Sequence, residues 1–231
     1  MADVIPFPLG ISKDFIIGWG LVGSVARYNA YSIIKFASIS SNRRFIEIET
    51  QIYDRLNDGE VHDGLLKYYR SSKDGIILGY ACNNSLRLYI AQQGGRRIPL
   101  SLKLRWAEQL IATLSFIHSK GILHGDISCK NAFLNEELNL KLGDFAGFPI
   151  NSKPVLVCYE TSHEHLEMTN ISIKSELFAL GSTLYEIMTG SRPYKSNSDF
   201  AIKAAYKEGN FPDLADLDAL SYVITNSNHR G

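Results

Sequence analysis

The chain has 231 residues, of which 45% are hydrophobic and 21% charged, a composition typical of a globular protein with one large domain or two smaller lobes. Its 24 Lys and Arg residues balance its 24 Asp and Glu residues, so the net charge indicates neither a nucleic-acid nor a membrane partner. The three cysteines form no disulfide or metal motif, and no apolar run reaches the roughly 20 residues of a membrane span. We therefore expect an intracellular protein, cytoplasmic or nuclear.

After an extension at residues 1–13, residues 14–80 predict a small β-rich lobe with one helix. Three segments rich in Ile, Val and aromatic residues are separated by Gly or Asn turns and predict strands, at residues 15–19, 24–28 and 32–36. Apolar residues recur at three- and four-residue steps over residues 43–56, which predicts a helix. A further strand is expected at residues 76–80.

Residues 81–231 predict a larger and mostly helical lobe, joined to the first by a hinge near residues 79–85. Apolar residues at helical spacing predict a long helix over residues 102–120, with Ser101 as its N-cap and Gly121 as its end. The other elements that the pattern predicts are two short strands and two helices, at residues 133–134, 140–142, 173–189 and 198–208. The predicted fold class is therefore α+β, with two lobes.

A glycine-rich segment lies at the turn between the first and second predicted strands. Gly18, Gly20 and Gly23 have the spacing G-x-G-x-x-G, and Val25 follows them. Glycines let a hairpin backbone approach phosphate oxygens, although a β-turn with three glycines explains the pattern about as well. The helical, acid-terminated unit of a Rossmann fold does not follow. Lys35 lies near the end of the third predicted strand, either as a snorkelling edge residue or as a phosphate ligand.

The segment around residues 122–146 carries the strongest chemical pattern. His124, Asp126 and Asn131 have the order His-x-Asp, four residues, Asn, and Asp144 with Phe145 follows thirteen residues after Asn131. Phosphoryl transfer from ATP needs a carboxylate to orient the attacking hydroxyl, and acidic and amide oxygens to hold Mg²⁺. A polar turn is the alternative interpretation. The position of this segment, after a long amphipathic helix and before two short strands, favours the catalytic one.

Together with the glycine segment and Lys35, this pattern resembles the eukaryotic protein kinase family over residues 15–215. Its amino-acid sequence is most similar to divergent kinases of filamentous fungi. The resemblance implies a bilobal fold with a small β-rich N-lobe and a mainly helical C-lobe that lacks its last helices. It also implies ATP and Mg²⁺ as cofactors and a protein substrate, with Ser/Thr favoured over Tyr as the acceptor.

The resemblance also implies the role of each site residue. Asp126 corresponds to the catalytic base, Lys130 to an accompanying catalytic cation, and Asn131 and Asp144 to the metal ligands. The positions that correspond to nucleotide-binding residues are Gly18, Gly20, Gly23, Val25, Lys35, Glu49, Gly79 and Ala81. Glu49 is the expected ion-pair partner of Lys35, with Glu47 on the adjacent helix strip as the competing choice. His124 is expected to form structural hydrogen bonds.

Several positions depart from the family pattern. Gly125 replaces the arginine that pairs with a phosphorylated activation segment in many kinases, so we expect an enzyme that does not depend on that ion pair. Ala146 replaces a glycine, Glu176 replaces an aspartate, and Ser162-His-Glu164 replaces Ala-Pro-Glu. If the last helices are missing, Glu164 is expected to be a buried charge without its partner.

Two alternatives remain at the level of sequence. A small-molecule kinase of the aminoglycoside or choline type also has His-Gly-Asp and a later Asn, but it lacks the block at residues 176–194 and the G-x-G-x-x-G-x-V loop. A pseudokinase that acts as a binding module is favoured by Glu176 and by the altered segment at residues 162–164. It is disfavoured by the competent residues at all five catalytic positions, which are Lys35, Glu49, Asp126, Asn131 and Asp144. The sequence does not indicate an oligomeric state.

Overall fold

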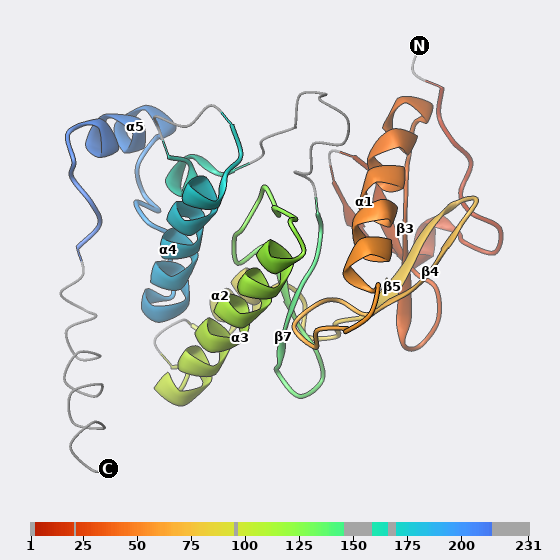
Figure 1. Ribbon diagram of the computed structural model, residues 1–231, viewed down its shortest axis with the longest axis horizontal. Coiled ribbons are helices and arrows are strands. Elements are labelled where there is room, and N and C mark those ends of the chain that lie inside the picture. The colour runs from red at the N-terminus through yellow and green to blue at the C-terminus, as the bar shows by residue number, and fades with distance from the viewer. Residues whose placement is uncertain (1–2, 21, 95–96, 146–158, 166–169, 214–231) are drawn as a thin grey trace.

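The computed structural model describes residues 3–20, 22–94, 97–145, 159–165 and 170–213. They form two parts that lie side by side (Figure 1). The amino-terminal part, residues 3–79, is a five-stranded antiparallel sheet of order β1-β2-β3-β5-β4 that packs against helix α1. The carboxy-terminal part, residues 80–213, contains helices α2 to α5 and the two-stranded sheet β6-β7. This arrangement is the two-lobed α+β fold that the sequence predicts.

The strands are β1 (Ile16–Trp19), β2 (Ser24–Arg27), β3 (Ser32–Phe36), β4 (Tyr68–Ser72), β5 (Gly75–Gly79), β6 (Ala132–Leu134) and β7 (Leu140–Leu142). The helices are α1 (Arg43–Leu56), α2 (Leu86–Gln92), α3 (Leu100–Ser119), α4 (Ile173–Thr189) and α5 (Asp199–Lys207). Short 3₁₀ turns are found at η1 (Lys13–Phe15), η2 (Ser40–Asn42) and η3 (Thr161–His163).

Every predicted strand and helix is present, but β4 and α2 were not predicted. β4 lies at the edge of the sheet and is mostly exposed, so it lacks the apolar alternation of a strand that is buried on one face. α2 has seven residues, too few to show a helical period, and its N-cap is Ser85, whose side chain accepts a hydrogen bond from the Leu88 amide. An exposed edge strand and a very short helix therefore escaped the sequence pattern.

The start of α3 differs from the prediction. The helix begins at Leu100 with Pro99 in the N-cap position, and Ser101 lies within its first turn, so Ser101 as the N-cap was wrong. The fixed backbone of Pro99, with φ −55°, leads the chain into the helix two residues earlier than predicted. The predicted end is confirmed, since the helix stops at Ser119 and Gly121 has a left-handed φ of 68°.

The sheet of the amino-terminal part has two different faces. Ile34 and Phe36 of β3 lie in a small core with residues of β2 and β5. Ile33 and Lys35 lie on the opposite face, because successive strand residues alternate, and Ile33 packs against the main core. This main core also contains buried residues of α1, α3 and α4, so one apolar cluster runs through both parts of the molecule. Lys35 therefore faces the carboxy-terminal part.

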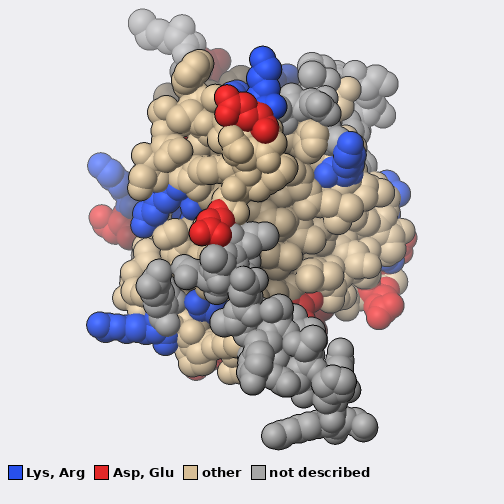
Figure 2. All heavy atoms as spheres, turned by 90° about the vertical axis from the view of Figure 1, so that its left-hand side faces the viewer, with Lys and Arg blue, Asp and Glu red and all other residues tan. Residues whose placement is uncertain are grey.

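Two properties of the described residues bear on possible partners: the distribution of charge on the surface, and the length and polarity of the helices. Acidic and basic side chains of the described residues are interspersed on the face shown in Figure 2, in keeping with the zero net charge of the chain. Among the helices of the described ranges, none is both long and apolar enough to cross a membrane.

Candidate functional site

Lys35, Glu49 and Asp144 form an ion triad at the boundary between the two parts. The Nζ atom of Lys35 on β3 lies 2.6 Å from Oε2 of Glu49 on α1 and also contacts Oδ1 of Asp144, just after β7. Lys35 and Glu49 are buried, whereas 43% of the Asp144 side chain is exposed. Glu47 is exposed and lines a separate cavity beside the amino-terminal residues. Glu49, rather than Glu47, is thus the partner of Lys35, as predicted.

The charges of this triad determine its protonation. Burial alone would lower the pKa of Lys35, but Asp144 and Glu49 outweigh that effect and raise the pKa above its ordinary value. The Lys35 ammonium lowers the pKa of Asp144, while burial raises the pKa of Glu49. Lys35 therefore stays protonated and Asp144 ionised at neutral pH, so that a fixed cation and an exposed anion lie side by side.

Asp126 and Asn131 lie together on the loop between α3 and β6. Asp126 is buried, and its Oδ2 lies 3.3 Å from Nζ of Lys130, whereas its Oδ1 forms no hydrogen bond with the described residues. Burial raises the pKa of Asp126, although the Lys130 charge opposes this. Nδ2 of Asn131 donates to the backbone oxygen of Asp126 at 2.8 Å, which fixes the amide. A buried carboxylate oxygen without a donor is uncommon and leaves Asp126 able to accept one further hydrogen bond.

His124 has the hydrogen-bonding role that the sequence predicts. One ring nitrogen, Nε2, donates to the backbone oxygen of Gly143 at 3.0 Å, and Nδ1 accepts from the Asp126 amide at 3.3 Å. Its ring also packs against Phe145, which contacts Tyr53 of α1 with ring centroids 5.3 Å apart. Because both nitrogens are used within the protein, His124 holds the Asp126 and Asp144 loops together.

Gly125 matters for the backbone of the catalytic loop, and not only because it lacks the arginine side chain of many kinases. Its φ of 80° lies in the left-handed region, and its amide donates to Oε1 of Glu176 at 2.6 Å. The other Glu176 oxygen, Oε2, accepts from Nε2 of His118 on α3 at 2.5 Å. Glu176 is fully buried at the start of α4, so its carboxylate ties the catalytic loop to two helices. The structure thus explains both Gly125 and Glu176 at these positions.

We expect Gly125→Ala to lower the free energy of unfolding by about 1–2 kcal/mol, because an L-residue is strained at this φ. The matched control is Gly181→Ala in α4, where an added Cβ meets no atom within 4 Å. In a helix interior that change is expected to stabilise the protein by about 0.5–1 kcal/mol. Urea unfolding of both variants measures the two effects, and equal midpoints would contradict the backbone explanation.

The predicted nucleotide-binding glycines lie on and beside β1, β2 and β5. The Gly20 amide donates to the Gly23 oxygen at 2.8 Å, which closes the turn between β1 and β2. A Cβ on Gly23 would lie 2.2 Å from the Phe36 oxygen, so close packing on β3 itself requires this glycine. Gly79 and Ala81 lie where the chain passes from β5 towards α2. Val25 pairs directly with Lys35 and so shares its face of the sheet.

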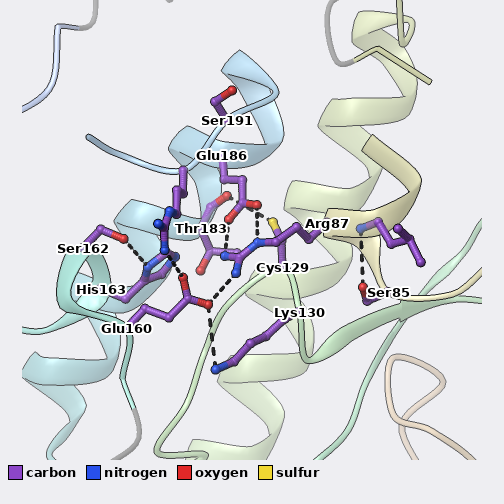
Figure 3. A network of polar contacts seen from close by, with 12 residues as sticks. Ser85, Arg87, Cys129, Lys130, Glu160, Ser162, His163, Thr183, Glu186 and Ser191 are labelled. Carbon is purple, nitrogen blue, oxygen red and sulfur yellow. Dashed lines mark hydrogen bonds and ion pairs between the residues drawn. The ribbon is translucent and has the colours of Figure 1, made fainter. Parts of the chain in front are cut away.

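Sequence reasoning missed an ionic network that includes Arg87, Glu160 and Lys130 (Figure 3). Nε and Nη2 of Arg87 on α2 donate to the two carboxylate oxygens of Glu186 on α4, at 2.6 and 2.7 Å. Nη1 of Arg87 donates to Oε1 of Glu160 at 2.5 Å, and Lys130 lies 3.8 Å from the same oxygen. These residues are far apart in the chain, and α2 itself was not predicted. No local pattern therefore indicated the network.

Glu164 differs from its prediction. It lies 3.7 Å from Nζ of Lys203 on α5, and 35% of its side chain is exposed, so a buried and unpaired Glu164 was wrong. Because Glu164 is partly exposed and lies near the Lys203 cation, it does not carry the free-energy cost of an isolated buried charge. The prediction for Ala146 and those for most of the activation segment, at residues 147–158, lie outside the described residues.

His163, which replaces the usual proline, is fully buried. Its Nδ1 lies 3.0 Å from Oγ of Ser162, and its Nε2 has no hydrogen-bond partner among the described residues. Burial lowers the pKa of His163 to about 4; Glu160 opposes this, whereas three cations add to it, namely Arg87, Lys130 and Arg192. The folded protein therefore disfavours protonation of this ring.

We expect the stability of the protein to fall below about pH 6.5, because the unfolded chain then binds a proton that the folded His163 rejects. The loss continues until the folded pKa of about 4 and amounts to about 3 kcal/mol. His163→Gln should remove this part of the pH dependence. Urea unfolding at pH 7 and pH 5 tests the prediction, and the same pH dependence in both proteins would contradict it.

The donor set at Asn131 and Asp144 fits a magnesium ion that is bound mainly through phosphates. In the described part of the chain, no cluster of three or more His, Cys, Asp or Glu side chains could hold a metal by itself. Mg²⁺ beside a nucleotide needs only one or two protein oxygens, with phosphates and waters as the other ligands. The ionised, partly exposed Asp144 and the fixed amide of Asn131 are oxygens of that kind.

Comparisons with known proteins agree with this geometry. The sequence profile of the family described as protein tyrosine and serine/threonine kinase matches residues 30–217. The chain is 27% identical over 183 residues to serine/threonine-protein kinase PDK1 of Cryptococcus neoformans var. grubii, covering 71% of this chain and 15% of that protein. It is 32% identical over 130 residues to serine/threonine-protein kinase Nek3 of Mus musculus, covering 53% of this chain and 25% of the relative.

A third relative is 3-phosphoinositide-dependent protein kinase 1 of Homo sapiens, at 25% identity over 184 residues, with 73% of this chain and 32% of the relative covered. The matched region spans about a third or less of these three relatives. The profile match covers most of the chain, from β3 to beyond α5, and includes the triad and the catalytic loop. The chain therefore belongs to the protein tyrosine and serine/threonine kinase family.

Proposed function

We propose that this chain is a catalytically competent protein kinase that transfers the γ-phosphate of ATP to a Ser or Thr hydroxyl of a protein. The observation that carries the proposal is that the ion triad of Lys35 and the carboxylate of Asp126 are assembled at the boundary of the two parts. Lys35 is held between Glu49 and Asp144, and on the neighbouring loop Asp126 has a buried carboxylate oxygen that no described residue hydrogen-bonds. The serine/threonine-protein kinase names of the relatives support the choice of acceptor.

In this proposal the residues of the triad bind the nucleotide. Glu49 fixes the Lys35 ammonium, which donates to the α- and β-phosphates. Asn131 and Asp144 would hold Mg²⁺, which neutralises the charge that develops on the phosphates during transfer. Because Lys35 contacts Asp144, the cation and the metal ligand are already placed side by side on the same site.

Asp126 orients the acceptor in the transfer step. Its free Oδ1 accepts the hydrogen bond of the substrate hydroxyl, whose oxygen bonds to the γ-phosphorus as the bond to the β-phosphate oxygen breaks. The hydroxyl proton passes to Asp126, and ADP is the leaving group. Lys130, 3.3 Å from Oδ2, stabilises the carboxylate before it takes up the proton. We also propose a cytoplasmic or nuclear location, and residues 14–80 and 81–231 as the two lobes.

One observation favours the alternative of a binding module without turnover. Ile33 occupies the place of alanine in the V-A-I-K pattern of kinases, and it lies on the same face of β3 as Lys35, paired with Leu78 of β5. A larger side chain on this face would leave less room for a nucleotide beside Lys35, which favours a module that interacts with proteins and transfers no phosphate.

Phosphate transfer to peptides tests the proposal and its alternatives. The protein, Mg²⁺ and γ-labelled ATP are incubated with three peptide pools that contain Ser, Thr or Tyr as the only acceptor, and with choline and an aminoglycoside. We expect label in the Ser and Thr pools. Label in the Tyr pool alone would contradict the choice of acceptor, and label in choline or the aminoglycoside alone would contradict a protein substrate. Nucleotide binding without transfer to any acceptor would support the binding module.

A further inference from the structure

Glu160 lies at the centre of the ionic network beside the catalytic loop (Figure 3). Its Oε1 accepts from Nη1 of Arg87 at 2.5 Å and lies 3.8 Å from Nζ of Lys130. Its Oε2 lies 3.3 Å from Nη1 of Arg192, in the connection between α4 and α5. Three cations from three regions of the carboxy-terminal part thus converge on one carboxylate. Only 14% of the Glu160 side chain is exposed.

The protonation and rigidity of the network suit an anchoring role. Burial alone would raise the pKa of Glu160, but the hydrogen bond and charge of Arg87 and the other cations lower it below the ordinary value. Glu160 is therefore ionised at neutral pH. The guanidinium of Arg87 is itself fixed by two parallel hydrogen bonds to Glu186, and charge-assisted pairs of this kind are strong and specific in direction.

Glu160 is connected to the catalytic carboxylate through Lys130. Nζ of Lys130 lies 3.3 Å from Oδ2 of Asp126 and 3.8 Å from Oε1 of Glu160, so two carboxylates share this ammonium. The backbone supports the connection, because the Arg87 amide donates to the oxygen of Cys129, next to Lys130, at 2.9 Å. Without Glu160, a half-exposed lysine would keep only one of its two ionic contacts.

We propose that Glu160 is a positioning residue, which rests on the proposed kinase function. Its carboxylate holds Lys130 beside Asp126 and ties the segment at residues 159–165 to α2. Gly125 provides no cationic side chain to grip this segment, and the cations that do so, Arg87, Lys130 and Arg192, meet on Glu160. A fixed carboxylate of the chain thus supplies the negative charge for these contacts, with no need for a phosphorylated residue.

The first test is the kinetics of Glu160→Gln, which keeps the shape of the side chain and removes its charge. We expect kcat to fall about 10- to 100-fold with KM for ATP within about threefold, because a small displacement of the catalytic groups lowers the rate of transfer. Glu160→Asp should recover part of kcat. The matched control is Glu164→Gln in the same segment, whose one ion pair spans 3.7 Å and whose kcat should stay within about twofold.

A double-mutant cycle distinguishes positioning from a general structural effect. If Glu160 acts through Lys130, then Glu160→Gln adds little to the loss of kcat in Lys130→Met. The positioning role is overturned if the kcat losses of the two single variants multiply in the double variant. It is also overturned if Glu160→Gln has the kcat of the wild type while Lys35→Met is inactive. Either result leaves the proposed function in place. Full activity in Lys35→Met would instead overturn the proposed function.

Hydrogen exchange of the backbone amides at residues 126–131 gives a second readout that does not need turnover. We expect Glu160→Gln to exchange faster there than the wild type, whereas Glu164→Gln should match the wild type. The urea midpoint of each protein is measured in parallel to separate local loosening from global unfolding. Unchanged exchange at residues 126–131 in Glu160→Gln would overturn the proposal even if the protein transferred no phosphate.

Discussion

Asp126→Asn is expected to lower the rate of phosphate transfer by about 10²- to 10⁴-fold, the usual contribution of a positioned general base. Asp126 is buried at 5% exposure, with one carboxylate oxygen near Lys130 and the other without a donor among the described residues, so the change removes the acceptor for the substrate hydroxyl and little else. Binding of ATP should change less than about threefold, because Asp126 is not among the residues proposed to hold the phosphates or Mg²⁺. Transfer rates and ATP titrations check both parts.

The control for this variant is Asp74→Asn in the exposed turn between β4 and β5. It makes the same chemical change far from the catalytic loop, and its transfer rate should equal that of the wild type. Equal rates in Asp126→Asn and Asp74→Asn would contradict the role of Asp126. A loss of ATP binding that matches the loss of transfer in Asp126→Asn would show that the residue acts in binding.

Lys35→Met is expected to reduce both ATP binding and transfer, and to destabilise the fold by about 3 kcal/mol. The lysine is the cation between Glu49 and Asp144, and removing one partner of a buried pair leaves an uncompensated charge. Glu49 already has a raised pKa, so it takes up a proton and limits the cost. ATP titration and urea unfolding measure the two effects, with Lys73→Met in an exposed turn as the control.

A second substitution separates the two effects of Lys35→Met. In Lys35→Met/Glu49→Gln the buried carboxylate is gone, so we expect part of the lost stability to return. Transfer should stay at the level of Lys35→Met, because the phosphate ligand is still absent. Recovery of transfer together with stability would mean that Lys35 has a structural role alone.

The fold and the ion triad could be predicted because the sequence patterns that indicate them are either local or follow a fixed order along the chain. Helices such as α1 and α4 bury one face, and β3 is an apolar run that is buried on both faces, so both signals are visible in the sequence. The pairing of Lys35 with Glu49 followed from the family resemblance together with the helical position of Glu49. The prediction for Gly125 was incomplete, since a sequence shows which residue is present but does not show a φ of 80°.

The parts that could not be predicted depend on distant contacts. Arg87, Glu160 and Glu186 are separated by up to 99 residues, and only folding brings them together. The polar strand β4 and the short helix α2 form because neighbouring elements pair with them and pack on them. Glu164 was predicted to lack a partner because the family pattern places its partner elsewhere, whereas Lys203 of α5 provides the nearby cation here.

Calorimetric titration of ATP into the wild-type protein, with and without Mg²⁺, tests the central claim most directly, with Asp144→Asn as the comparison. The claim is that Lys35, Asn131 and Asp144 form a Mg²⁺-dependent nucleotide site. The predicted result is ATP binding that Mg²⁺ strengthens by about tenfold or more in the wild type and hardly at all in Asp144→Asn. The absence of any ATP binding by the wild-type protein at any Mg²⁺ concentration would contradict the account.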